Sequence, residues 1–199
     1  KAQAEANLQL ARRKFVQRLG LDVDIDLILD DTIVSENLPA ITLEEALEEG
    51  MANRIELAQA RAGVSIAEKE LSLATNDYTP ILTRRKAEID LDIAKLRYEQ
   101  AQQGIRLDIE NSYHQMHDAY RRMELSEMQL AEAEESHRVV EALFAAGMAT
   151  DVEILQAQTG LMQARSARVN AIFDFNMART QMFHAIGWGP GNDLGNGEK

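Results

Sequence analysis

Small residues recur at every seventh position along two stretches of this chain. The upstream run is Ser112, Ala119, Ser126 and Ala133, and the downstream run is Ala157, Ala164, Ala171, Ala178 and Ala185. A seven-residue repeat of small side chains lets two long helices approach closely along a supercoiled seam. Helices packed along such a seam form rods or walls, so the pattern argues against a compact domain built around a pocket.

Helix-end signals between the two runs predict a hairpin. Gly147 suits a left-handed C-terminal cap, and Thr150 with Glu153 makes a capping box that begins the next helix. The helices 84–146 and 151–186 should therefore double back on each other. At 1.5 Å per residue, the first of them would be roughly 90 Å long.

The heptads change phase within this long helix. Its first half matches a helix over 55–76, and a four-residue slip after residue 105 opens a second seam that faces 151–186. Such an insertion is a stutter, which locally unwinds a left-handed supercoil. The two shorter helices should thus lie end to end along the long one. The lower turn sets the register of the second pairing and places Ala133 opposite Ala164.

The remaining segments flank these hairpins. Residues 3–19 have the pattern of an amphipathic helix, and Val23–Leu29 alternates apolar and polar residues as a strand does. We expect a helix with a small strand-containing linker over 1–43, helical hairpins over 44–187, and a flexible tail over 188–199.

The first helix and the last share an internal sequence repeat. At a constant offset, Leu8, Phe15, Leu19 and Gly20 correspond to Phe175, Met182, Ile186 and Gly187. The first twenty residues therefore look like the end of an earlier copy of the same unit.

Composition and charge exclude several functions. The net charge of −12 argues against a nucleic-acid surface, which needs a concentrated basic face. The basic triplets at 12–14 and 84–86 are interpreted as solvated helical turns. No apolar run approaches the ~20 residues of a membrane-spanning helix, so we expect the chain alone to be soluble.

The sequence offers little for catalysis. The absence of cysteine excludes disulfides, thiolate metal sites and a cysteine nucleophile. His114, His117 and Asp118 could hold a metal, but no third ligand of matching geometry is evident, so a solvated pair of histidines is the preferred interpretation. Because no nucleophile-base set, phosphate loop or pair of catalytic carboxylates stands out, we expect no enzyme and no cofactor.

Two stretches carry a family resemblance. From Phe144 to Ala157, an aromatic residue, a glycine and a threonine precede a valine-acid-aliphatic-leucine segment. Upstream, Asn53-Arg54-Ile55-Glu56-Leu57 leads into a helix that reaches Pro80-Ile81-Leu82. Together with the long helix that changes partner, they resemble the periplasmic helical part of the TolC family of outer-membrane efflux channels. The resemblance covers nearly the whole chain.

The resemblance implies an all-α fold of long antiparallel coiled-coil hairpins that form part of an α-barrel. In the family, three protomers of two tandem repeats form a twelve-helix periplasmic tunnel. This implies a homo-oligomer that exports substrates with a periplasmic adaptor protein and an inner-membrane transporter, attached to the outer membrane in the complete protein. The alternative is a periplasmic adaptor or a structural coiled-coil rod, but the glycine-rich strands of an adaptor are not visible.

The sequence departs from the family pattern in two ways. Against the family's two repeats, the sequence contains only the end of the first, and we expect the absent parts to have been removed or closed up in the numbering, with a natural soluble relative as the alternative. The residues Asp77 to Thr83, where the family has its membrane strands, are also too few for one spanning strand, which needs about 9 to 11.

The resemblance also places an aperture at the tip of the hairpin. It implies that Glu153, and Asp151 beside it, face the tunnel mouth, where carboxylates brought close by symmetry bind cations. Acids also favour a helix N-terminus through its dipole alone. Both interpretations stay open for Glu153, whereas Asp151 directly follows the N-cap and fits the dipole better. Phe144, Gly147 and Thr150 would form the turn presented to partner proteins.

Overall fold

The computed structural model describes residues 2–21 and 37–188. These ranges contain five helices and no strand: α1 (Ala2–Arg18), α2 (Leu43–Asn53), α3 (Ile55–Ala74), α4 (Ile81–Ala145) and α5 (Asp151–Ala185). The described part of the chain is therefore all-α. The strand predicted at Val23–Leu29 lies outside the described residues. Within the described ranges, no helix combines the length and apolar character that crossing a membrane requires.

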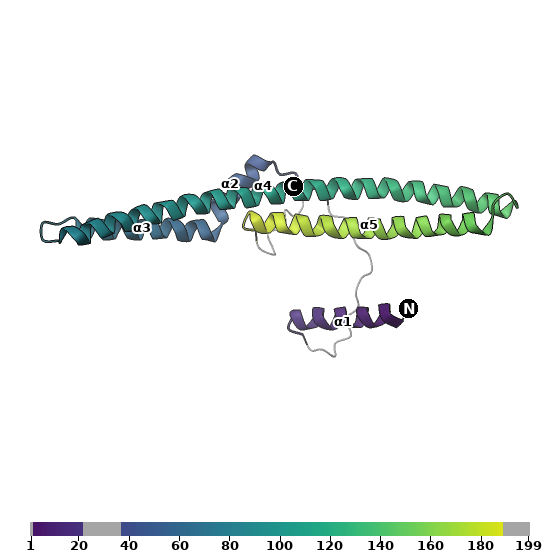
Figure 1. Ribbon diagram of the computed structural model, residues 1–199, viewed down its shortest axis with the longest axis horizontal. Coiled ribbons are helices and arrows are strands. Elements are labelled where there is room, and N and C mark those ends of the chain that lie inside the picture. Colours follow the sequence, from purple (N-terminus) through teal and green to yellow (C-terminus); the bar gives the residue numbers. More distant parts are fainter. Residues whose placement is uncertain (1, 22–36, 189–199) are drawn as a thin grey trace, which may run out of the picture. The chain divides into compact units, whose positions relative to one another are not determined.

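The chain forms two compact units, Lys1–Ile33 with α1 and Val34–Lys199 with the other four helices. The second unit is organised around α4, whose 65 residues extend about 97 Å. Helix α3 lies along the first half of α4 and α5 along its second half (Figure 1). The predicted end-to-end arrangement of two shorter helices on one long helix is confirmed.

The predicted heptad positions are the ones that pack. Between α3 and the first half of α4, the buried seam residues are Leu57, Ala67, Ala74, Leu91 and Ile105. Between α5 and the second half of α4, they include Met116, Ala119, Met123, Ser126, Phe175 and Ala178. Because small side chains alternate with larger ones, the helices lie close together along both seams.

Three side-chain contacts determine the register of α4 and α5. The rings of Tyr120 and Phe175 lie 5.3 Å apart, and ion pairs join Glu127 to Arg168 at 3.3 Å and Glu134 to Arg165 at 3.6 Å. Each contact lies within two residues of the predicted pairing, in which Ala133 faces Ala164. A register one heptad away would separate these partners.

The phase slip is visible in the burial of α4. An unbroken heptad through Ala94 and Ala101 would bury residue 108 next, but Asp108 is exposed and Ile109 is buried instead. Gly50 of α2 packs directly on this point. A Cβ atom at Gly50 would lie 2.3 Å from Cδ1 of Ile109 and 3.5 Å from Cα of Ile186, the residue after α5. Glycine therefore lets α2 approach the place where α4 changes partner.

The helix ends follow the predicted signals. Thr42 with Glu45, and Thr150 with Glu153, form complete capping boxes. Gly147 has a φ of 72° and ends α4. Its N–H donates to Phe144 O, and the next N–H donates to Leu143 O, which is the Schellman arrangement.

The same arrangement at Gly187 orders the residue that follows it. The N–H of Trp188 donates to Phe183 O at 2.8 Å, and its ring stacks on the Phe183 ring at 5.7 Å. The indole N–H also donates to the Glu49 carboxylate at 2.6 Å. Trp188, assigned from the sequence to the flexible tail, thus packs between α5 and α2. The other residues of that tail lie outside the described residues.

Helix α1 has the same local structure as the end of α5, as the internal sequence repeat predicts. Gly20, with a φ of 68°, closes a Schellman arrangement with Gln17 and Val16. The side chains of Leu8, Phe15 and Leu19 are exposed, whereas their counterparts Phe175, Met182 and Ile186 are fully buried. The same apolar stripe is therefore covered in α5 and open in α1.

Replacing Gly50 by alanine should lower the free energy of unfolding by roughly 1–3 kcal/mol, because the added methyl group overpacks the fully buried Ile109. The double variant Gly50→Ala, Ile109→Val should recover part of this loss, since valine lacks the obstructing Cδ1. Gly63→Ala is the control: its Cβ meets open space, and alanine should stabilise α3 by up to ~1 kcal/mol. Urea denaturation measures all three, and equal effects of the two alanines would contradict the close approach.

Candidate functional site

The tip between α4 and α5 brings the predicted contact residues together. Phe144 lies in the last turn of α4, Gly147 forms the turn, and Thr150 is the N-cap of α5. Phe144 and Met148 are exposed although both are apolar. The turn holds its shape through its own backbone hydrogen bonds and presents these side chains at the end of the hairpin.

Glu153 takes part in the cap of α5. Its Oε2 accepts hydrogen bonds from the Thr150 N–H at 2.7 Å and from the Thr150 hydroxyl at 2.8 Å. The hydrogen bond from the backbone, and then that from the hydroxyl, hold the pKa of Glu153 below its ordinary value of 4.5. The side chain remains exposed, as does Asp151 two residues earlier. The structure thus shows the capping role directly, and the aperture role stays a prediction.

A groove of about 520 Å³ runs between α4 and α5 beside the tip. Small residues, among them Ala133, Ala157 and Gly160, line it and leave room between the helices. Glu153 and Glu132 both border the groove, so two carboxylates from opposite helices share one hollow. Glu132 was not identified from the sequence, because its proximity depends on the register of α4 and α5.

The two histidines of α4 differ in their surroundings. The rings of His114 and His117 lie 5.9 Å and 4.4 Å from the Tyr113 ring. His114 is exposed, but the Nε2 atom of His117 is buried and has no hydrogen-bond partner within the described residues. Burial, and then repulsion by Arg121, lowers the pKa of His117. The prediction of a solvated pair is therefore wrong for His117. The described ranges hold no group of three or more His, Cys, Asp or Glu side chains that could bind a metal.

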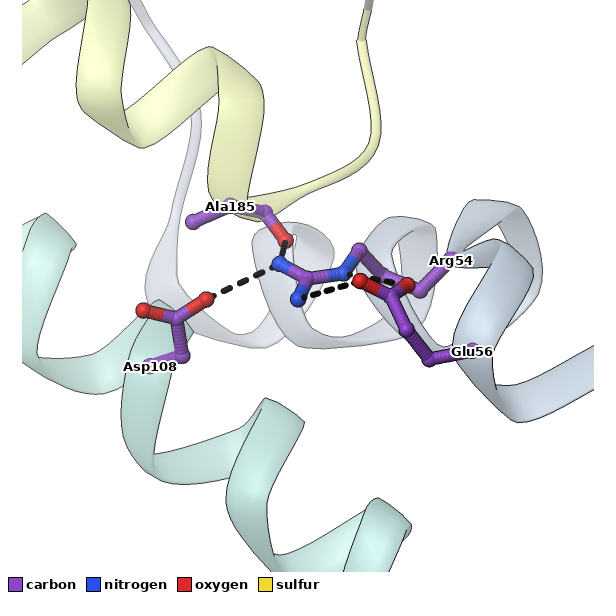
Figure 2. A network of polar contacts seen from close by, with 4 residues as sticks. All are labelled: Arg54, Glu56, Asp108 and Ala185. Carbon is purple, nitrogen blue, oxygen red and sulfur yellow. Dashed lines mark hydrogen bonds and ion pairs between the residues drawn. The ribbon is translucent and has the colours of Figure 1, made fainter. Parts of the chain in front are cut away.

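A second candidate site lies where α3, α4 and α5 meet. Figure 2 shows the guanidinium of Arg54 between Glu56, Asp108 and the backbone of Ala185. Nη1 donates to Oδ2 of Asp108 at 2.9 Å and to the carbonyl of Ala185 at 3.0 Å. Nε and Nη2 donate to the two carboxylate oxygens of Glu56 at 3.0 Å and 3.1 Å. One side chain thus joins the beginning of α3, the middle of α4 and the end of α5.

At this junction, Arg54 and Glu56 each stabilise the charged form of the other. Only 14% of the Arg54 side chain is exposed. Burial acts to lower the pKa of Arg54, but the hydrogen bonds to Glu56 and Asp108 outweigh it, so the pKa lies above its ordinary value. The same hydrogen bond lowers the pKa of Glu56. The cation also stabilises the negative end of the α5 dipole at Ala185. A planar guanidinium suits this set of acceptors, which a single ammonium could not span.

From the sequence alone, Arg54 is only one residue of a matched motif. Its nearest partner, Glu56, lies two residues away, but Asp108 and Ala185 lie 54 and 131 residues away. These partners come together only because α4 changes partner beside them. No local pattern indicates such a contact.

Arg54→Met should lower the free energy of unfolding by about 1–3 kcal/mol, because it removes several charge-assisted hydrogen bonds at a largely buried position. Arg106→Met is a matched control, since it removes an exposed pair with Glu110 on the same helix and should cost less than about 0.5 kcal/mol. Because the pKa of Glu56 is depressed, its contribution is present above pH 4.5 and is lost as the pH falls through the folded-state pKa. The difference in free energy of unfolding between wild type and Arg54→Met, measured by denaturation, should therefore shrink in strong acid. Equal losses in the two variants would show that Arg54 has no special role.

The comparison with known families agrees with this geometry. The family model described as outer membrane efflux protein matches residues 82–187, which are more than half of the chain and contain nearly all of α4 and the whole of α5. Among curated proteins, none matches the chain. Proteins of this family are transport channels of the outer membrane, not enzymes. With its coiled-coil hairpin and capped tip, the chain belongs to the outer membrane efflux protein family.

Proposed function

We propose that this chain forms part of the wall of a periplasmic tunnel in an outer-membrane efflux or secretion channel. The channel exports substrates together with an inner-membrane transporter and a periplasmic adaptor protein. Family membership supports the transport role and the outer-membrane association. The role as a wall is carried by one observation, the distribution of side chains around α5.

Helix α5 has three different faces. One is buried against α4. A second is an apolar stripe in which Leu155, Met162, Val169 and Phe173 are 45–63% exposed. Spacings of seven and four residues place these four side chains on one side of the helix. The third face is exposed and mainly polar: it includes Gln156, Gln163 and Asn170, with Met177 as the next residue at the same spacing.

Two apolar faces imply two neighbouring helices. A helix in an isolated two-helix rod has one neighbour and needs one apolar stripe. A helix in a closed wall has a neighbour on each side and a polar face toward water. The open stripe of α5 therefore favours a wall over the alternative of a structural rod. We propose that it packs against another copy of the chain in a symmetric homo-oligomer, a trimer as the family resemblance implies.

The tip is the proposed aperture of this tunnel. Glu153, with Asp151 beside it, would form a ring of carboxylates that binds cations. Both carboxylates are exposed at the end of the hairpin, which supports this role. Phe144, Gly147 and Thr150 would present the turn to the adaptor and the transporter.

The wall is tested by Met162→Glu, Val169→Glu, which places two charges in the open stripe. The control Gln163→Glu, Asn170→Glu adds the same charges one residue further along, on the polar face. Wild type and control should self-associate in sedimentation velocity, whereas the stripe variant should stay monomeric with unchanged circular dichroism. A complete gene carrying the stripe variant should also fail to support dye export. A wild-type chain that remains monomeric at high concentration would contradict the proposal that the chain forms part of a tunnel wall.

The aperture is tested by comparing Glu153→Gln with Glu153→Ala in the complete channel. Glutamine can still serve in a capping box, so it removes the charge and keeps the cap, whereas alanine removes both. Both variants should raise single-channel conductance and weaken block by cations, and only alanine should weaken the helix end. Block of the wild type should weaken on acidification as the Glu153 carboxylates become protonated, whereas block in Glu153→Gln should not depend on this titration. If Glu153→Gln had the same conductance and the same cation block as the wild type, Glu153 would act only as a helix cap.

A further inference from the structure

A hollow beside the junction at Arg54 is lined by positive charge and by no carboxylate. It lies between the end of α2, the first three turns of α3 and Tyr98 of α4, and its volume is about 420 Å³. Arginine, hydroxyl and apolar side chains line it, and none of its lining residues is an aspartate or a glutamate, in a chain whose net charge is −12. Small-molecule sites have volumes of about 300–1,000 Å³ and combine apolar walls with a few polar groups. The hollow therefore has the size and the chemistry of a ligand site.

The shape of the hollow comes from small side chains on α3. Ala58, Ala62 and Ser65 line it, and spacings of four and three residues place them on one face of the helix. All three are exposed, so the hollow opens to solvent. On the neighbouring face, Leu57 is buried against α4, and with Met51 of α2 it supplies the larger apolar surface of the lining. A ligand can thus reach apolar surface from water without displacing a helix.

The two arginines of the hollow, Arg54 and Arg61, differ in their partners. Arg54 is bound to Glu56 and Asp108, so its charge is largely neutralised within the chain. Arg61 follows it by seven residues, lines the hollow from α3 and is exposed. Within residues 2–21 and 37–188, Arg61 forms no ion pair. Its planar guanidinium is therefore available to bind an oxyanion through two parallel hydrogen bonds.

Two hydroxyl groups can add to this contact. The Tyr98 hydroxyl accepts a hydrogen bond from Nε2 of Gln102 at 3.1 Å, which leaves its own O–H as a donor. Ser65 supplies a second O–H in the lining. Donors with no carboxylate among them favour an anion, whereas a cation would be repelled by Arg61. A small inorganic anion would gain nothing from the apolar part of the lining, so the ligand should itself have an apolar part.

We propose that the hollow binds small amphipathic organic anions. The carboxylate or sulfonate of the ligand pairs with Arg61 and accepts hydrogen bonds from the Tyr98 and Ser65 hydroxyls, while its apolar body covers Met51 and Leu57. Charge complementarity and the apolar lining together select this class. Because the ligand contacts α2, α3 and α4 at once, its binding should stabilise their junction. The inference is independent of the tunnel proposal, since one chain supplies every residue of the hollow.

Fluorescence titration with a matched pair of probes tests the role of charge. Anilinonaphthalene sulfonate is an anion, and phenylnaphthylamine has the same ring system without the sulfonate. Arg61→Gln should weaken binding of the sulfonate at least about tenfold, because it removes charge-assisted hydrogen bonds, and should change binding of phenylnaphthylamine less than about twofold. The control Arg122→Gln changes an exposed arginine of α4 outside the hollow, and it should bind both probes as wild type does.

Filling the hollow tests the role of its apolar lining. The double variant Ala58→Gln, Ala62→Gln replaces two small lining residues by long polar ones, and it should weaken binding of both probes at least about tenfold. The control Ala131→Gln, Ala142→Gln makes the same changes at exposed positions of α4 outside the hollow, and it should leave both affinities unchanged. Decanoate should displace the sulfonate probe from the wild type at concentrations at least about tenfold below those of decanol.

Ligand binding should also stabilise the fold. Decanoate should raise the urea midpoint of the wild type and not that of Arg61→Gln, because a ligand that binds only the folded chain shifts the unfolding equilibrium. Circular dichroism of every variant verifies that the helices are intact. Equal loss of both probes in Arg61→Gln, equal effects of Arg61→Gln and Arg122→Gln, or unchanged binding after the hollow is filled would overturn the proposal. It would also be overturned if the wild type bound neither probe.

Discussion

The fold depends on a change of heptad phase in the middle of one helix. A continuous heptad would keep the same face of α4 toward a single partner along its whole length. The slip between Ile105 and the second seam lets α4 pair first with α3 and then with α5 without a break in its backbone. The gap between the two partners would be a weak point. Arg54 bridges it, and Gly50 lets α2 cover it.

The junction makes this arrangement one unit of structure. The coiled-coil seams alone would leave α3 and α5 as separate partners of α4, able to separate independently. The guanidinium of Arg54 joins both to Asp108 at the slip, and Trp188 ties the end of α5 to Glu49 of α2. The tip at Gly147 and the α3–α4 connection lie at the two ends of the same continuous helix.

Most of this architecture follows from local rules. Seven-residue spacing predicts the paired helices and their seams, and Gly147 with the Thr150–Glu153 capping box predicts where α4 ends and where α5 begins. The features that the sequence does not indicate are contacts between residues far apart in the chain. The partners of Arg54, the place of Trp188 and the proximity of Glu132 to Glu153 depend on helices meeting across many residues. The sequence likewise does not indicate that the Nε2 atom of His117 is buried.

In the proposed tunnel wall, the open stripe of α5 faces a second copy of the chain. Photo-crosslinking in the complete channel tests it most directly, with a benzoyl-phenylalanine at residue 162 and, for comparison, at residue 163. Irradiation should give covalent dimers of the chain from position 162, on the stripe, and none from position 163, on the polar face. Equal crosslinking from both positions, or none from position 162, would contradict it.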